Sequence, residues 1–162
     1  MSQKIKILCE NEIVEVDLDI VMKSPILKTM IDDTGKEGEI PIPNTHMSTL
    51  KKVFEYCEHY RTSVPKEISR PLKNNNLAQH GVEEWDVNFI DMGSVDEIID
   101  IVVAANFLGI EPLLVLGCAK IASLIKGKST EEIREIFNIV NDFTPEEENQ
   151  LREENKWAEE AI

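Results

Sequence analysis

The stretch from Ser94 to Ile125 constrains this chain most, because it predicts two helices with very little polar surface. The first opens at Ser94, with Glu97 three residues later, which is the spacing of a capping box. The second has Pro112 in its first turn, where a missing amide N–H costs nothing. A helix that is apolar around most of its circumference is covered on more than one side. The rest of the chain must cover one side, which leaves the other to be explained.

The second of these helices carries a narrow apolar row. At 100° per residue, the four residues that fall within it are Leu114, Cys118, Ile121 and Ile125. Three more residues are expected to widen it, namely Leu113, Gly117 and Leu124. This row is the sequence's first indication of a contact surface.

The charge balance limits the class of partner. The 162-residue chain carries 31 acidic and 17 basic residues, for a formal net charge of −14. Nucleic acids and anionic membrane surfaces attract basic faces, so neither is expected as a partner. No run approaches the roughly 18 apolar residues of a membrane span, and the N-terminus lacks the apolar core of a signal peptide.

The cysteines and histidines predict no metal site. Cys9, Cys57 and Cys118 are odd in number, far apart and set in apolar patterns, which favours buried, reduced thiols. None forms a CxxC pair, and the three histidines lack the spacing of metal ligands. Reduced thiols are typical of a protein of the cytoplasm or nucleus.

The first part of the chain predicts a small sheet. Residues 4–9 alternate between apolar and polar side chains and predict a strand, which a tight turn at 10–11 connects to a second strand over 13–17. Residues 40–42 predict a short extended segment, which Pro41 confines to a sheet edge or a short pairing.

Helices are expected around these strands. Residues 18–22 predict one helical turn, and Ser24 with Pro25 starts a helix that continues to Ile31. Apolar residues at helical spacing predict an amphipathic helix up to about Tyr60, with Thr45 as its cap. A shorter helix is expected around Trp85 and Phe89.

Residues 61–82 interrupt this regularity. They contain two prolines, the triplet Asn74-Asn75-Asn76 and few apolar residues, which favours a flexible insertion. A linker between two domains is the alternative, but the first 60 residues need the apolar helices after the gap for burial. We therefore predict an α+β domain over residues 1–126, followed by C-terminal helices over 127–162.

Capping signals divide the C-terminal part. Gly127 suits the left-handed position that ends a helix, and Ser129 with Glu132 forms the spacing of a capping box. Thr144 is expected to cap a last helix that begins at Pro145 and continues to about residue 160.

The last helix has few large apolar residues, chiefly Leu151 and Trp157. Most helical stability in proteins comes from packing an apolar face, so this helix cannot be ordered by core burial alone. Two interpretations remain open. It frays in isolation with Trp157 as a loose anchor, or it docks on a partner, where tryptophan is a typical energetic centre of the interface.

The motifs of common catalytic sites are absent. Residues 127–129 resemble the end of a phosphate-binding loop, but Ala122 stands where the first glycine is required, and the run is expected inside a helix rather than after a strand. The sequence has no GxSxG, HExxH or glycine-rich dinucleotide turn. We therefore expect no catalytic residue, cofactor or metal, and interpret the chain as a binding module.

Five runs carry a family resemblance: SPILKTMIDD, IPIPN, LKKVFEYCEHY, AANFLGIEPLL, and the long CAKIASLIKGKSTEEIREIFNIVNDFTPEEENQLREENKW. Together they resemble the Skp-type adaptors, the S-phase kinase-associated proteins of SCF ubiquitin ligases. The resemblance covers nearly the whole chain except residues 61–82. It implies a BTB/POZ fold, with a small three-stranded sheet packed with helices and a C-terminal helical extension that elongin C would lack.

The resemblance implies an adaptor without catalytic activity of its own. Such an adaptor bridges the N-terminal region of a cullin to F-box substrate receptors. The cullin in turn connects the adaptor to a RING subunit and a ubiquitin-conjugating enzyme. The reduced thiols, rather than the resemblance, indicate a cytoplasmic and nuclear location, and self-association of the apolar surface would give a homodimer when no F-box is bound. An alternative is a BTB-type protein that self-associates through the same apolar surface, without F-box partners.

The resemblance also assigns residues. The cullin-binding pair falls on Asn106 and Phe107, where phenylalanine replaces the family's tyrosine. The F-box-binding residues fall on Leu114, Cys118, Ile121, Ile125, Ile133, Phe137, Asn141, Phe143 and Trp157. Pro145 matches a proline that some protist members hydroxylate and glycosylate. Pro112 and Val140 replace a glycine and a lysine of the family, and the family's cysteine after Trp157 is absent.

We expect residues 145–162 to be mobile in the free protein and ordered when an F-box is bound, because their apolar face is so thin. Hydrogen exchange of the free protein and of its complex with an F-box peptide measures this directly. Equal protection of these amides in the two states contradicts the expectation.

Overall fold

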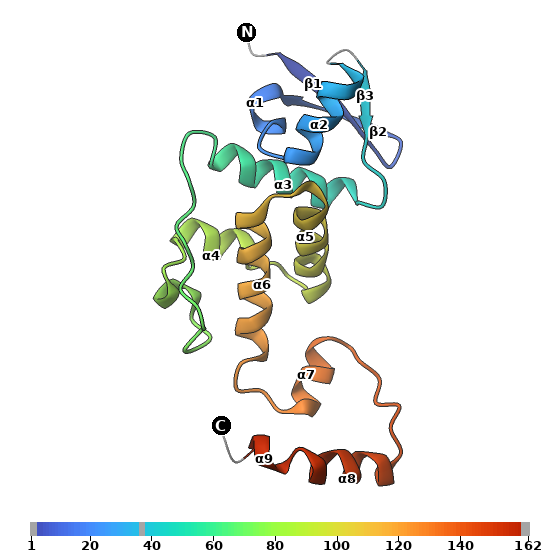
Figure 1. Ribbon diagram of the computed structural model, residues 1–162, viewed down its shortest axis with the longest axis vertical. Helices are drawn as coiled ribbons and strands as arrows, with labels where there is room; N and C mark the ends of the chain where they lie inside the picture. The colour runs from blue at the N-terminus through green and yellow to red at the C-terminus, as the bar shows by residue number, and fades with distance from the viewer. Residues whose placement is uncertain (1–2, 36–37, 160–162) are drawn as a thin grey trace. The chain divides into compact units, whose positions relative to one another are not determined.

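The computed structural model describes residues 3–35 and 38–159 (Figure 1). These residues form two compact units, Met1–Gly127 and Lys128–Ile162, which are described separately. No helix within the described ranges is long and apolar enough to cross a membrane.

A mixed three-stranded sheet begins the first unit. Strand β1 (Lys4–Cys9) pairs antiparallel with β2 (Glu12–Asp17) and parallel with the short β3 (Glu39–Pro41), in the order β2-β1-β3. Glu10 and Asn11 in the hairpin turn both have positive φ, 51° and 67°, which suits the twist of a two-residue hairpin. The predicted hairpin and edge strand are confirmed.

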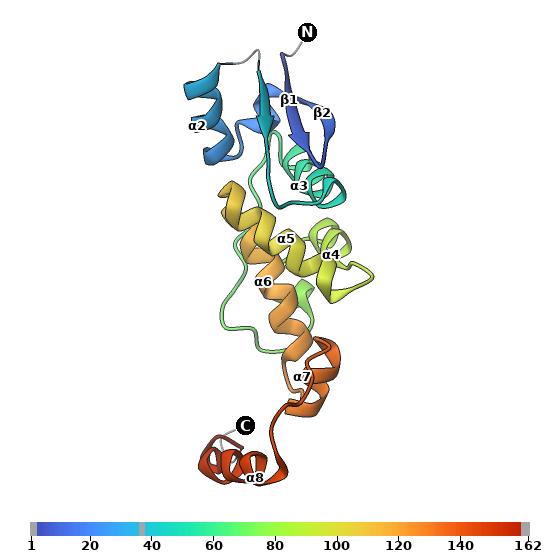
Figure 2. The same ribbon diagram turned by 90° about the vertical axis from the view of Figure 1, so that its right-hand side faces the viewer.

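Helices α1 (Leu18–Val21) and α2 (Pro25–Thr34) lie between β2 and β3 in the chain, and α3 (Met47–His59) follows β3. Helix α2 is longer than expected, since it passes Ile31 and ends at Thr34. Figures 1 and 2 show α3 between the sheet on one side and the helices α4, α5 and α6 on the other. Its Leu50 and Val53 are completely buried there, so α3 forms the middle of the core.

The predicted cap of α3 is wrong. His46, not Thr45, is the N-cap residue, and its side chain makes no capping hydrogen bond. The carboxylate of Glu10 instead accepts from the Met47 N–H at 2.8 Å and contacts His46 Nδ1 at 2.8 Å. The bond from Met47, followed by that with His46, lowers the pKa of Glu10. A residue from the hairpin turn therefore caps a helix 37 positions later.

The segment 61–82 is anchored more firmly than its composition predicts. Ile68, Leu77 and His80 are buried, and the Ser69 N–H donates to the His80 carbonyl at 3.0 Å. Within it lies the 3₁₀-helix η1 (Leu77–His80). Its flexibility stays a prediction, but Ile68, Leu77 and Val82 belong to the core, whereas Val64 is exposed.

The helices after this segment complete the first unit: α4 (Glu84–Ile90), α5 (Val95–Leu108) and α6 (Glu111–Ile125). The Ser94 hydroxyl accepts from the Glu97 N–H, as the cap predicts. Gly109, with φ of 70°, ends α5. Where α5 and α6 pack together, a Cβ on Gly117 would lie 2.5 Å from Val102 Cγ2. Only glycine allows the two helices to approach this closely.

The second unit contains α7 (Thr130–Ile136), α8 (Pro145–Glu154) and α9 (Lys156–Glu159). The expectation of one continuous last helix is wrong, because Asn155 interrupts it with φ of −103° and ψ of 7°. Its side-chain amide donates to the Leu151 carbonyl at 2.8 Å, the kind of local bond that makes asparagine a poor residue within a helix. Residues 160–162 of the predicted helix lie outside the described residues.

Gly117→Ala is expected to lower the free energy of unfolding by about 1–2 kcal/mol. Displacing Val102 to make room for the new methyl group costs about 1–3 kcal/mol, and the higher helix propensity of alanine offsets up to about 1 kcal/mol of that cost. Urea denaturation measures the change.

Gly93→Ala is the control, since the nearest atom to its Cβ would be Glu97 Oε2 at 3.9 Å. Adding Val102→Ala should recover part of the loss caused by Gly117→Ala. An unchanged or increased stability of Gly117→Ala contradicts the packing argument.

Candidate protein-binding surfaces

The apolar row of α6 lies on the accessible side of that helix. Leu114 and Ile121 are half-buried, and Cys118 and Ile125 are exposed. The opposite side, with Leu113, Leu116 and Gly117, is buried. The four-residue row predicted from helical spacing therefore forms one face. Leu113 and Gly117, which were expected to widen it, do not belong to it, because close packing on α5 requires Gly117 to face inward.

A groove of about 430 Å³ runs beside this row. One wall comes from segment 61–82, through Ile68, Pro71 and Leu72, and the other from α6, including Leu114 and Cys118. The segment that sequence patterns treat as an insertion thus contributes apolar side chains next to the candidate surface.

Helix α5 presents a second exposed surface. The predicted pair Asn106 and Phe107 lies near its C-terminal end, with both side chains exposed. Val103 and Ile99 lie four and eight residues before Phe107 and are 56% and 36% exposed, against 39% for Phe107. The three form one apolar stripe at helical spacing. Val103 was not among the predicted contact residues, although the four-residue spacing of Ile99, Val103 and Phe107 could have revealed it.

The second unit leaves most of its apolar side chains accessible. Ile133 and Phe137 are half-buried, whereas Phe143 and Trp157 are exposed, Trp157 by 71%. Further exposed apolar residues that the sequence did not single out as contacts are Ile139, Val140 and Leu151. Apolar side chains that find so little cover in their own chain are typical of protein-binding surfaces.

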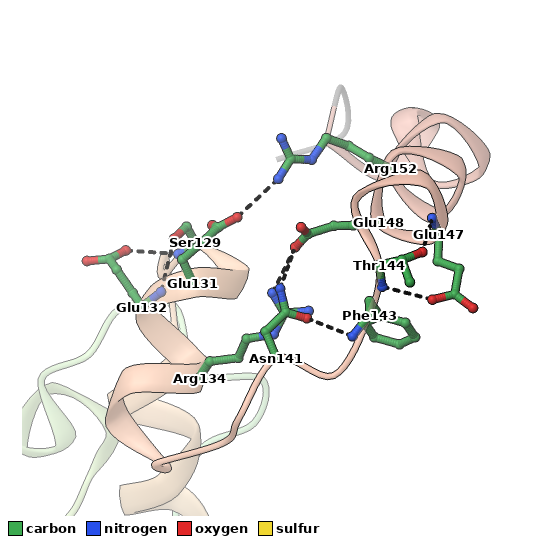
Figure 3. A network of polar contacts seen from close by, with 10 residues as sticks. All are labelled: Ser129, Glu131, Glu132, Arg134, Asn141, Phe143, Thr144, Glu147, Glu148 and Arg152. Carbon is green, nitrogen blue, oxygen red and sulfur yellow. Dashed lines mark hydrogen bonds and ion pairs between the residues drawn. The ribbon is translucent and has the colours of Figure 1, made fainter.

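Capping boxes organise this second unit (Figure 3). The Ser129 hydroxyl accepts from the Glu132 N–H while the Glu132 carboxylate accepts from the Ser129 N–H, and Thr144 and Glu147 repeat the arrangement. The backbone bonds from Ser129 and Thr144 lower the pKa values of Glu132 and Glu147. Both predicted boxes are confirmed, and Pro145 occupies the first turn of α8 with its side chain exposed.

One carboxylate ties α7, α8 and the loop between them together. Glu148 Oε1 accepts from Arg134 at 2.9 Å and from the Asn141 amide at 3.3 Å (Figure 3). The Asn141 Oδ1 in turn accepts from the Phe143 N–H at 3.3 Å, and the Arg134 guanidinium lies 6.0 Å from the Phe143 ring centre. Asn141, predicted as a contact residue, therefore also fixes the backbone that presents Phe143.

The described residues offer no metal centre. No group of three or more His, Cys, Asp or Glu side chains within the described ranges lies where it could hold an ion. Cys9 and Cys57 are buried as expected, and burial raises the pKa of Cys57 to about 12. Cys118 is exposed, so the expectation of three buried thiols is wrong there. It lies on the accessible face of α6 rather than toward α5.

A small mixed sheet packed with helices, followed by a helical unit with exposed apolar side chains, defines a protein-binding module of the POZ type. Two family models match the chain, the Skp1 family tetramerisation domain over residues 3–62 and the Skp1 family dimerisation domain over residues 111–158.

Similar proteins agree with these models. The S-phase kinase-associated protein 1 homolog of Tetrahymena thermophila is 53% identical over 99% of this chain and 96% of the relative. The E3 ubiquitin ligase complex SCF subunit sconC of Arthroderma benhamiae is 45% identical over 91% of this chain and 89% of the relative. The subunit of the same name from Emericella nidulans is 43% identical over 98% of this chain and 99% of the relative. The chain belongs to the Skp1 family.

Arg134→Gln is expected to raise hydrogen exchange of the α8 amides roughly fivefold, because it removes a charge-assisted bond of about 1 kcal/mol to Glu148. The Arg134 and Glu148 side chains are only 18% and 32% exposed, which limits screening by solvent. Exchange followed by NMR measures the effect.

Arg152→Gln is the matched control. Its ion pair with Glu131 has both side chains 57% exposed, and such pairs contribute little. Equal effects of the two substitutions contradict a special role for Arg134.

Proposed function

We propose that this protein is the adaptor subunit of an SCF-type, cullin–RING ubiquitin ligase, where it joins the cullin to F-box substrate receptors. The observation that carries the proposal is the accessible row Leu114, Cys118, Ile121 and Ile125 on a helix whose other side is buried. The names of the relatives support it, since two of those described above are called SCF subunits.

The proposed F-box contacts come from two sets of residues. The first is the α6 row. The second consists of residues of the C-terminal unit, namely Ile133, Phe137, Asn141, Phe143 and Trp157. When a partner covers the apolar side chains among them, the loss of contact with water stabilises the complex by about 25 cal/mol per Å² of apolar surface buried. Trp157, exposed by 71%, has the most area to contribute.

The proposed cullin contact is the exposed end of α5. Phe107 offers an aromatic ring without the hydroxyl of the family's tyrosine, and Asn106 offers an amide for hydrogen bonds. We include Val103 in this surface because it continues the stripe of Phe107 toward the start of α5. A largely apolar contact of this kind does not require the missing hydroxyl.

In this role the protein performs no chemistry. Its contribution is to hold a substrate receptor and the cullin in a fixed relation, so that the RING subunit and conjugating enzyme recruited by the cullin reach the substrate. We place this activity in the cytoplasm and the nucleus. Pro145, exposed in the first turn of α8, is accessible to the hydroxylation and glycosylation that the family resemblance suggests.

Self-association is the second candidate function. An apolar row that no F-box covers can be covered by a second copy of the chain. Mass measured across a range of concentrations, with and without an F-box peptide, separates the two functions. A tight dimer that the peptide does not dissociate favours self-association, whereas dissociation by the peptide favours the adaptor.

Ile121→Lys is expected to weaken binding of an F-box peptide roughly 30-fold or more, because it places an unpaired charge at the centre of an apolar contact. Isothermal titration calorimetry with the full chain measures this. Ile13→Lys is the control, since Ile13 is an exposed apolar residue on β2, outside the proposed surface. Retained affinity of Ile121→Lys rules out the assigned face.

The double substitution of Asn106→Lys and Phe107→Lys is expected to abolish co-purification with a cullin N-terminal fragment while F-box binding remains. The reason is that the two surfaces lie on different helices, and the substituted side chains are both exposed. Cullin binding that survives these changes refutes the assignment of this surface.

A further inference from the structure

Segment 61–82 is held against α6 by its own buried and hydrogen-bonded residues (Figures 1 and 2). Ile68 is buried in the core. The Ser69 N–H and the Ser69 hydroxyl both donate to the His80 carbonyl, at 3.0 and 3.1 Å, and so join the two ends of a loop. These contacts place residues 70–72 at the wall of the groove beside α6.

This groove is continuous with the α6 row. Leu114 and Cys118 belong to the row and also line the groove, so the two surfaces share an edge. Beyond that edge the α6 side of the groove carries the small side chains of Ala119 and Ala122, and Pro71 on the opposite wall is exposed. A partner that covers the row therefore reaches the groove without a second binding event.

Arg70 places a positive charge at the groove. It is the only charged residue among the described residues that line it, and it is exposed. Its side chain makes no hydrogen bond or ion pair with any other described residue. Arginine binds carboxylates through two parallel N–H donors, so the groove favours a partner with an acidic side chain next to an apolar one.

We propose that this groove selects among F-box receptors, an inference that rests on the adaptor role proposed above. The receptor segment that covers the α6 row inserts an apolar side chain between Leu72 and Ala119. An aspartate or glutamate next to that side chain pairs with Arg70. Receptors that carry this pair of side chains bind more tightly than receptors that lack it.

The wall of the groove and the α6 row have different relations to the family. Residues 68–72 lie outside both matched ranges, 3–62 and 111–158, whereas the whole row lies within the second one. The row is therefore suited to what receptors have in common. The wall adds a contact that the matched domains do not contain, and an added contact of this kind discriminates between partners.

Other occupants fit less well. Nucleic acids and other polyanions need several cations, whereas one arginine lines this groove. A second copy of the chain could supply a carboxylate, but it would have to cover the row as well, because the row and the groove share an edge. Continuity with the proposed receptor surface therefore favours the receptor.

The test uses the full chain and, as the probe, an F-box domain with about ten flanking residues on each side, which reach roughly 35 Å when extended. A display library substitutes every position of the probe in turn, and its binding is measured. We expect one position to prefer aspartate or glutamate over lysine about threefold to tenfold. A neighbouring position should prefer leucine over alanine about tenfold.

Arg70→Glu should reverse the charge preference, so that lysine is favoured at the same position. Lys73→Glu is the matched control, since Lys73 is exposed on the same segment, does not line the groove and changes the net charge equally. Ala119→Phe fills the groove and should remove the preference for leucine. A charge preference that Arg70→Glu leaves unchanged, or that Lys73→Glu reverses equally, overturns the proposal.

Ile121→Lys separates this inference from the adaptor role, because it should weaken every member of the library rather than change one preference. If Ile121→Lys abolishes binding but Arg70→Glu alters no preference, the groove inference fails and the adaptor role stands. If the probe does not bind the unsubstituted protein, both fail.

Sedimentation equilibrium without the probe identifies a second copy as the occupant. Weaker self-association of Arg70→Glu, together with unchanged library preferences, overturns the receptor as the occupant of the groove. Self-association that Arg70→Glu leaves unchanged, together with a reversed charge preference, supports the receptor.

Discussion

The close packing of α6 on α5 at Gly117 is the contact on which the candidate surfaces depend. A Cβ at position 117 would lie 2.5 Å from Val102 Cγ2, so no residue other than glycine allows the two helices to approach this closely. Gly117, Leu113 and Leu116 must therefore face inward, which fixes the rotation of α6. Because successive residues are 100° apart, turning the helix by one position would move its apolar row toward the core. The packing thus decides which side remains for a partner.

The second unit is ordered by a different kind of interaction. None of the described side chains of α7 and α8 is buried, so no core of its own holds these helices. Two capping boxes satisfy the first N–H groups of each helix, and Glu148 joins Arg134 to the loop through Asn141. These polar bonds shape the backbone without covering Phe143 or Trp157. The apolar side chains stay available because none of these polar bonds covers them.

Much of the fold and part of the candidate surface could be predicted from residues that lie close together in the sequence. A capping box lies within four residues, and the row of α6 needs only helical spacing, so both could be read from the sequence and both are confirmed. The errors involve contacts distant in sequence or competing local bonds. Glu10 caps α3 from the hairpin, 37 positions away in the sequence, and the Asn155 side chain bonds its own helix. The resemblance assigned the contact residues, but spacing alone gave only the α6 row.

In the proposed adaptor role, the two kinds of order have different energetic consequences. The α6 row is held by a packed core, so its side chains lose little freedom when a receptor covers them. Helix α8 has no buried side chain. We expect residues 145–162 to become ordered only when a receptor binds, and that ordering reduces the net affinity. A shared adaptor must release one receptor before it accepts another. The preformed row on α6 provides specificity. The free energy that ordering residues 145–162 costs keeps binding weak enough for one receptor to be exchanged for another.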